Sequence, residues 1–94
     1  MPDSQTATAV TVNLVYLARL REAFGRAGEP LILPGNEVSV TAILAALRAR
    51  GGAFAAELAP GRAVRVAVNH ALFAVDSPVR DGDEVALLPP VTGG

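Results

Sequence analysis

Residues 39–52 read SVTAILAALRARGG, and this stretch decides the fold because it contains the clearest helix of the chain. Ser39 can accept hydrogen bonds from the free N–H groups of the first turn. Gly51 and Gly52 end the helix, and residues 53–59 predict a further helical turn whose apolar side chains pack on the core. The helix buries one apolar stripe, with residues at i, i+3, i+4 and i+7: Val40, Ile43, Leu44 and Leu47.

Alternation of apolar and polar residues on either side of this helix predicts strands. The predicted strands are residues 10–16, 30–34, 64–68, 72–75 and 84–88. Pro30 and Pro34 bracket the second of them, and proline cannot donate to a ladder, so this segment is expected at an edge. A short helix over residues 18–24, ended by Gly25, is expected after the first strand.

The predicted strands are joined by residues typical of turns. Asn69 and His70 form a tight turn, and residues 76–78 and 81–83 form two more. We expect Asp81 to accept hydrogen bonds from nearby backbone N–H groups in its own turn. Asp81, Asp83 and Glu84 lack the further ligand spacing of a calcium loop, so we interpret them as turn residues and predict no metal site.

The order of these elements predicts an α+β fold, with one sheet covered by one main helix. The 94 residues suffice for a single domain, which we place at residues 10–88. Residues 1–9 are small and polar and are expected to form a flexible N-terminal extension. Residues 89–94 form an extended C-terminal tail.

Composition excludes several classes of function. The net charge of −1 gives no basic surface for nucleic acid or for an anionic membrane. There is no cysteine, and the single histidine, His70, cannot hold a metal alone, so we interpret it as a solvated turn residue. No signal-peptide pattern is visible in residues 1–9, and no apolar run approaches the ~20 residues that span a bilayer, so a cytoplasmic location is expected.

All eight basic residues are arginine, so the chain has no side-chain amine. An activated carboxyl terminus therefore cannot acylate a lysine of its own chain.

The last predicted strand is followed by Pro89-Pro90-Val91-Thr92-Gly93-Gly94. The two prolines favour an extended course, and six extended residues reach at most roughly 20 Å. The glycines have no side chains, so a narrow channel can admit them. Leu87 and Leu88 lie on opposite faces of the strand, so one should face the core and the other belongs to an apolar interface.

The segments AVN (residues 67–69), DGDEVA (residues 81–86) and PPVTGG (residues 89–94), with the first strand and helix, resemble the small subunit of molybdopterin synthase. That family consists of ubiquitin-like β-grasp sulfur carriers. Its paired aromatic residues are replaced here by Tyr16-Leu17 and Leu87-Leu88, which keep apolar bulk and bear on the fit to partners.

The resemblance implies a defined chemistry with no catalytic side chain and no bound cofactor. An E1-like adenylyltransferase would use ATP to activate the carboxylate of Gly94, and a sulfur donor would convert it to a thiocarboxylate. The tail of Pro89, Pro90, Val91, Thr92 and Gly93 would enter the large catalytic subunit of the synthase, a sulfurtransferase complex, and deliver sulfur to a cyclic pyranopterin precursor.

Three alternatives remain open from the sequence. The chain could carry sulfur for another pathway, such as thiamine thiazole synthesis. It could be a ubiquitin-like modifier joined to lysines of other proteins. It could also be an interaction module whose tail is inert.

Overall fold

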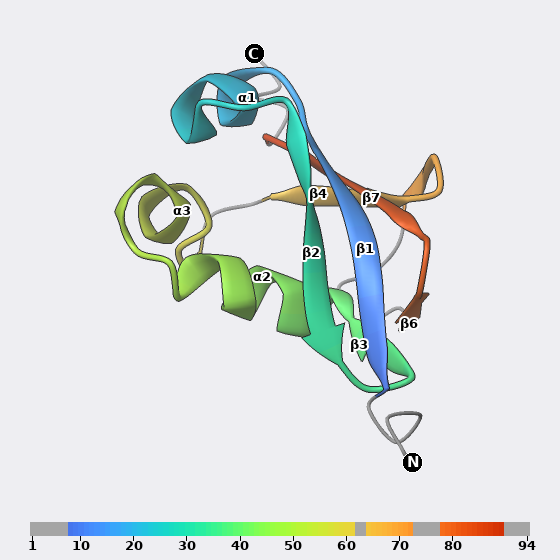
Figure 1. Cartoon of the computed structure of the whole chain (residues 1–94). Coiled ribbons are helices and arrows are strands. Elements are labelled where there is room, and N and C mark those ends of the chain that lie inside the picture. The colour runs from blue at the N-terminus through green and yellow to red at the C-terminus, as the bar shows by residue number, and fades with distance from the viewer. Residues whose placement is uncertain (1–7, 62–63, 73–77, 90–94) are drawn as a thin grey trace.

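The computed structural model of the chain describes residues 8–61, 64–72 and 78–89. Within them the fold consists of a five-stranded mixed sheet, a two-stranded sheet and three helices (Figure 1). The strand order is β2-β1-β7-β4-β5 in the larger sheet and β3-β6 in the smaller. The elements are β1 (Ala9–Tyr16), α1 (Arg19–Phe24), β2 (Gly28–Pro34), β3 (Glu37–Ser39), α2 (Val40–Arg48), α3 (Gly52–Glu57), β4 (Arg65–Val68), β5 (Ala71–Leu72), β6 (Pro78–Arg80) and β7 (Glu84–Leu88).

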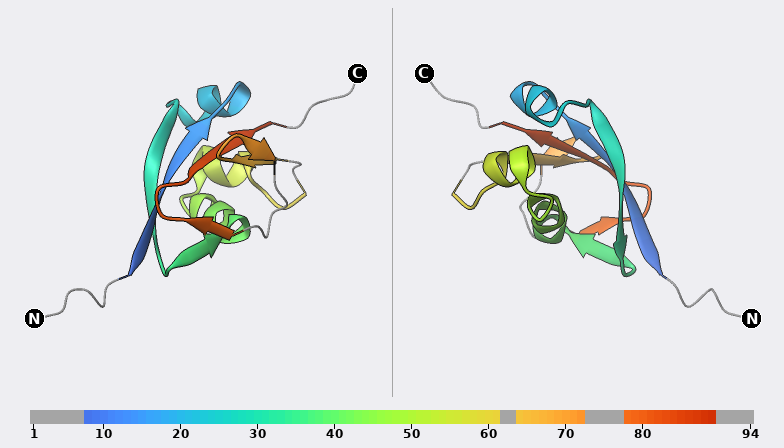
Figure 2. Two further views of the ribbon diagram at one scale, coloured as in Figure 1. Left: turned by 90° about the vertical axis from the view of Figure 1, so that its right-hand side faces the viewer. Right: turned by 60° about the vertical axis from the view of Figure 1, so that its left-hand side comes forward.

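The centre of the larger sheet is the parallel pair of β1 and β7, whose register runs from Asn13 opposite Glu84 to Tyr16 opposite Leu87. β2 pairs with β1 and β4 pairs with β7, both antiparallel. The helices lie on one face of this sheet (Figure 2). Because β1 and β7 are parallel, the carboxyl ends of both strands meet at the same end of the molecule.

The helix predicted after Ser39 is confirmed. The Ala42 amide donates to the Ser39 hydroxyl over 3.0 Å, and this bond satisfies one of the open N–H groups of the first turn. Val40, Ile43 and Leu47 are completely buried against the sheet. The further helical turn is confirmed as α3. Phe54 lies within this helix and is half-buried, and Leu58, the next residue after it, is buried.

The edge position of β2 is confirmed, and its prolines occupy the positions that suit them. The amide of Tyr16 donates to the carbonyl of Ala27, and that of Gly35 donates to the carbonyl of Thr8. Antiparallel bonds alternate along a strand, so residues 28, 30, 32 and 34 turn their backbone groups away from β1. Pro30 and Pro34 therefore remove two of the outward N–H groups to which a further strand could bind.

Two strands were missed and several boundaries move. β3 and β6 were not predicted, and Pro78, expected in a turn, is the first residue of β6. Each of these strands has three residues, too few to show alternation. β1 begins at Ala9, one residue earlier than predicted, and β5 covers residues 71–72, whereas residues 1–7 and 73–77 lie outside the described residues.

None of the helices in the described ranges is long and apolar enough to cross a membrane.

Candidate functional site at the base of the tail

The predicted tail leaves the larger sheet from the end of β7, which has a neighbouring strand on each side. Leu87 is completely buried, whereas Leu88 and Pro89 are half-buried. The two leucines thus lie on opposite faces, as predicted. Leu87 belongs to the core and is not available for an interface, so Leu88 is the leucine that could belong to the predicted apolar interface. Residues 90–94, with the predicted site residues Pro90, Val91, Thr92, Gly93 and Gly94, lie outside the described residues.

A small apolar area surrounds Leu88 on the face of the sheet opposite the helices. Val15 pairs with Ala86 in the β1–β7 ladder, and Leu17 follows Tyr16 at the end of β1. The Leu17 amide donates to the Leu87 carbonyl over 3.1 Å, so Leu17 extends this ladder beside the last residue of β7. The side chain of Leu17 is 39% exposed. Ala86 lies on the same face but is buried. We call Val15, Leu17 and Leu88 the tail-base patch.

Leu17 is held in place by a tight turn. The amide of Leu20 donates to the Leu17 carbonyl over 3.1 Å, and Ala18 between them has φ 52° and ψ −128°. This is the first central position of a type II′ turn, which normally takes glycine. An alanine in such a conformation costs of the order of 1 kcal/mol. The strain lies directly beside the place where the tail begins.

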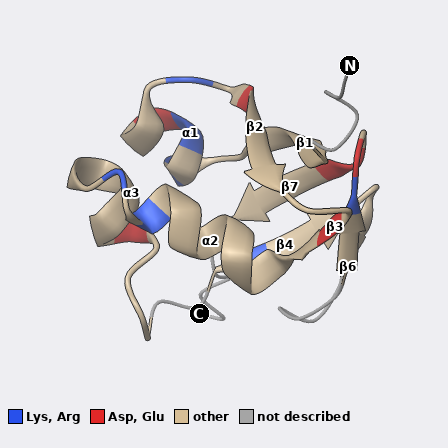
Figure 3. Ribbon diagram, turned by 60° about the horizontal axis from the view of Figure 1, so that its bottom comes forward, with Lys and Arg blue, Asp and Glu red and all other residues tan. Residues whose placement is uncertain are grey.

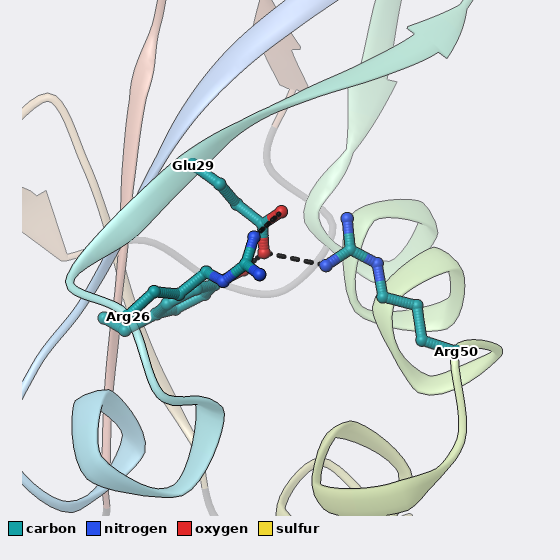
Figure 4. Close-up of polar contacts among 4 residues, drawn as sticks. Arg26, Glu29 and Arg50 are labelled. Atoms are coloured by element: carbon teal, nitrogen blue, oxygen red, sulfur yellow. Dashed lines mark hydrogen bonds and ion pairs between the residues drawn. The ribbon is translucent and has the colours of Figure 1, made fainter.

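On the face of the larger sheet that the helices cover, a polar network joins three segments near the end of β7 from which the tail leaves (Figure 4). The hydroxyl of Tyr16, on β1, donates to Oε2 of Glu29, on β2, over 2.6 Å. Arg50, after α2, donates to the same oxygen over 2.7 Å, and Arg26 donates to Oε1 over 3.2 Å. The Glu29 side chain is only 11% exposed, so its charge is compensated by two guanidinium groups where water has little access.

This network shifts the pKa values of its members. Burial raises the pKa of Glu29, but hydrogen bonds from Arg50 and Tyr16, together with the charges of Arg50 and Arg26, outweigh burial and hold the pKa below its usual value. Burial, and then the hydrogen bond to Glu29, raise the pKa of Tyr16 far above its usual value. Glu29 is therefore a carboxylate and Tyr16 a neutral donor at neutral pH.

Three aromatic rings continue the network between α1, α3 and β1. Phe24 and Phe54 stack with centroids 4.2 Å apart, and Tyr16 meets Phe24 edge-on at 4.8 Å. The guanidinium of Arg50 lies 4.9 Å from the centroid of Phe54, a cation–π geometry. Sequence analysis missed this cluster because its members are far apart along the chain and share no spacing.

Hydrogen bonds also hold the start of β7, and they correct the role predicted for Asp81. Oδ1 of Asp81 accepts from the amide of Thr11 over 2.7 Å, so this carboxylate binds β1 and not its own turn. Asp83 stabilises the turn instead, because its Oδ2 accepts from the Arg80 amide over 2.9 Å and its Oδ1 accepts from the Asn69 side chain over 3.0 Å. These two bonds lower the pKa of Asp83.

The turn at Asn69 and His70 is confirmed, with φ of 50° and 72°. The His70 side chain is 84% exposed. No group of three or more histidine or acidic side chains suited to a metal ion occurs in the described ranges.

A parallel pair of central strands, an antiparallel strand on each side and helices on one face define a β-grasp protein of the ubiquitin-like type. The fold class predicted from the sequence is confirmed. The sequence model of the ThiS family matches residues 14–94, and the chain belongs to that family.

Comparison with individual proteins agrees with this assignment. The chain is 34% identical over 83 residues to the molybdopterin synthase sulfur carrier subunits of Haemophilus influenzae and of Escherichia coli, covering 88% of this chain and 99% of each relative. The resemblance found in the sequence is thereby confirmed.

Three solved structures share the fold. The HVO 2177 protein of Haloferax volcanii superposes with a TM-score of 0.77 at 26% identity, over 92% of this chain and 88% of that chain. SAMP1 of the same organism gives a TM-score of 0.70 at 26% identity, over 89% and 99%. The complex of subunits 1 and 2 of the molybdopterin-converting factor of Helicobacter pylori gives a TM-score of 0.57 at 24% identity, over 90% and 100%, and this likeness concerns the fold alone.

Proposed function

We propose that this chain is the sulfur-carrier subunit of a molybdopterin synthase, with the sulfur carried as a thiocarboxylate on Gly94. The observation that carries the proposal is the sequence PPVTGG directly after the central strand of a ThiS-family domain. Two relatives that align over 99% of their length bear the name of this subunit.

The chemistry needs three steps on the carboxylate of Gly94. An α-carboxyl group with a pKa near ~3.5 is an anion at neutral pH and resists nucleophiles. An E1-like adenylyltransferase joins it to the α-phosphate of ATP and releases pyrophosphate. A sulfur donor then displaces AMP and leaves a thiocarboxylate. The terminal sulfur, once ionised, attacks a cyclic pyranopterin precursor in the large subunit, and water then cleaves the bond between the sulfur and the Gly94 carbonyl carbon, which leaves the sulfur on the precursor and restores the carboxylate.

The fold supplies a rigid base for this tail. β7 is hydrogen-bonded on both sides, so the point at which the tail leaves the domain is fixed. A tethered sulfur has a high effective concentration at the acceptor. In this proposal the tail-base patch, with Leu17 as its exposed member and Leu88 half-buried, contacts the large subunit while the tail enters its active site.

The test is an intact mass of the untagged protein after incubation with ATP, a sulfur source and the adenylating enzyme. We expect the mass to rise by the difference between sulfur and oxygen. Fragmentation must locate the change on Gly94, because oxidation of Met1 gives nearly the same shift. A variant without Gly93 and Gly94 is the control and should show no gain. The proposal fails if Gly94 is unmodified while the same enzyme modifies a known carrier.

Two neighbouring functions are separated by further measurements. The ThiS family match also suits a sulfur carrier for thiamine. Rescue of a strain that lacks the molybdopterin carrier, but not of one that lacks the thiamine carrier, supports our proposal. The likeness to SAMP1, a small archaeal modifier protein, favours a protein modifier as the alternative. That function predicts heavier adducts that resist thiols.

A further inference from the structure

The turn before β7 contains two neighbouring residues that can react with each other. Asp81 is the one aspartate of the chain that is followed by glycine. The turn follows β6 at the end of the molecule where acidic residues gather (Figure 3), and both residues are exposed. Gly82 has φ of 89°, a conformation that favours glycine, so the fold keeps here the residue type that leaves the aspartate carboxyl group open to attack by the next amide.

The structure holds both reacting groups on the backbone of one residue of β1. Oδ1 of Asp81 accepts from the amide of Thr11 over 2.7 Å, and the amide of Gly82 donates to the carbonyl of Thr11 over 2.8 Å. We call these two bonds the Thr11 clamp. Beside it the amide of Asn13 donates to the carbonyl of Asp83 over 2.9 Å, where the β1–β7 ladder begins. The side chain of Asp81 thus takes the place of a backbone carbonyl and extends the ladder beyond β7.

The Thr11 clamp opposes a reaction between the two residues for a geometric reason. It points the N–H of Gly82 and a carboxyl oxygen of Asp81 side by side at β1, whereas ring closure requires the nitrogen and Cγ to face each other. A reaction that needs a near-attack geometry is slow when hydrogen bonds hold its groups in another one. β1 is paired on both sides, so Thr11 cannot follow the two groups as they turn.

We propose that Asp81 and Gly82 form a latent isoaspartate site, which reacts only when both residues leave the Thr11 clamp. The nitrogen of Gly82 attacks Cγ of Asp81, a nitrogen–carbon bond forms, and the amide proton leaves with the carboxyl hydroxyl group as water. Water then opens the succinimide ring at the main-chain carbonyl of Asp81. The chain now runs through Cβ and Cγ of this residue, and its former main-chain carbonyl is a free carboxylate.

The modified chain cannot restore the Thr11 clamp. The backbone gains one methylene group between residues 81 and 82, and the carboxylate branches from Cα, so the two partners of Thr11 lose their spacing. Because β7 starts directly after this turn, and its register with β1 begins here, the modification should loosen the start of that strand. The inference does not depend on sulfur carriage, since the reaction needs only these two residues and water.

The experiment compares the full wild-type chain in two states at neutral pH, one folded and one kept unfolded in urea. Isoaspartate has the same mass as aspartate, so peptide chromatography separates the two forms and electron-based fragmentation locates the change at residue 81. Hydrogen exchange of the Gly82 amide is measured on the folded sample. This amide must leave the carbonyl of Thr11 both to exchange and to attack, so the two measurements report the same opening.

We expect isoaspartate at residue 81 to form at least about tenfold more slowly in the folded chain than in urea, and this factor should match the slowing of Gly82 amide exchange within about threefold. Asp83, which is followed by Glu84, is the internal control and should stay unmodified in both samples. The inference is overturned if the folded chain isomerises as fast as the unfolded one, if the two factors disagree, or if Asp83 reacts as readily as Asp81.

A matched pair of variants tests the Thr11 clamp itself. Thr11→Pro removes the N–H from which Asp81 accepts, whereas Thr11→Val keeps this N–H and removes only the hydroxyl group. The clamp uses both backbone groups of Thr11, so the proline removes no bond to β2. In folded samples Thr11→Pro should isomerise at least about fivefold faster than Thr11→Val, which should match the wild type. Equal rates in the two variants would overturn the inference, and if Thr11→Pro does not fold, the two wild-type factors decide.

Discussion

The two ends of β7 are held by different kinds of contact. At its start, backbone amides donate to the side chains of Asn69, Asp81 and Asp83, and these hydrogen bonds tie the strand to its neighbours near the surface. At its end, Leu87 is buried beside Tyr16, whose hydroxyl is bonded to a nearly buried carboxylate. Short directional bonds fix the register at the start, whereas burial supplies most of the stability at the end. The place where the tail leaves depends on both.

The comparison predicts its largest effect at the two consecutive leucines. Leu87→Ala leaves a cavity in the core and should lower the free energy of unfolding by about 3 kcal/mol. Leu88→Ala removes a half-buried side chain from the open face and should cost less than about 1 kcal/mol. Urea denaturation of both variants measures the difference. Equal costs would show that the two faces contribute equally to stability.

The polar network gives the next largest effect. Glu29→Ala leaves the buried Tyr16 hydroxyl without its acceptor and removes the partner of Arg26 and Arg50, so we expect a loss of about 2 kcal/mol. Glu22→Ala removes an exposed carboxylate on α1 and should change stability by less than about 0.5 kcal/mol. If thermal unfolding shows equal changes, the network contributes nothing beyond ordinary surface charge.

Features that depend on neighbouring residues could be predicted from the sequence, whereas contacts between distant segments could not. The apolar stripe of α2 and its Ser39 cap are local patterns, and both were predicted correctly. The proline-bracketed edge strand followed from the chemistry of single residues. The contact between Tyr16 and Glu29 depends on how β1 and β2 pair, and Arg50 reaches it from a third segment. No spacing in the sequence encodes such a meeting.

The candidate site divides in the same way. Strand geometry predicted that one of the two residues Leu87 and Leu88 faces the core. The register of β7 with β1 and β4 decides that this residue is Leu87. Asp81 was assigned to its own turn because aspartate commonly bonds locally, whereas the fold brings Thr11 to it from the start of the chain. β3 and β6 were missed because each buries a single valine, Val38 or Val79, against the other.

The start of β7 should respond more weakly than the end. Asp83→Ala removes an acceptor for the Arg80 amide and for the Asn69 side chain, and should cost about 1 kcal/mol because these groups can turn to water. Asp81→Ala removes one bond to Thr11 and should cost less. Hydrogen exchange of the Arg80 amide should quicken in Asp83→Ala but not in Asp81→Ala. Faster exchange in both would mean that the turn opens as one unit.

Acid should lower the free energy of unfolding, and the slope of this decline with pH depends on Glu29 and Asp83, whose contacts lie at opposite ends of β7. Both carboxyl groups have folded pKa values below their usual values of 4.5 and 3.8. The unfolded chain therefore binds protons first as the pH falls, so stability is fully present above these values and declines as the pH drops through the lower folded ones.

Urea denaturation from neutral pH down to about pH 3 measures this slope. The double variant Glu29→Gln and Asp83→Asn removes both titrating groups, so its stability, although lower at neutral pH, should fall less steeply with acid. If the double variant keeps the wild-type slope, other carboxyl groups govern the response to acid, and the contacts at the ends of β7 do not depend on these two charges.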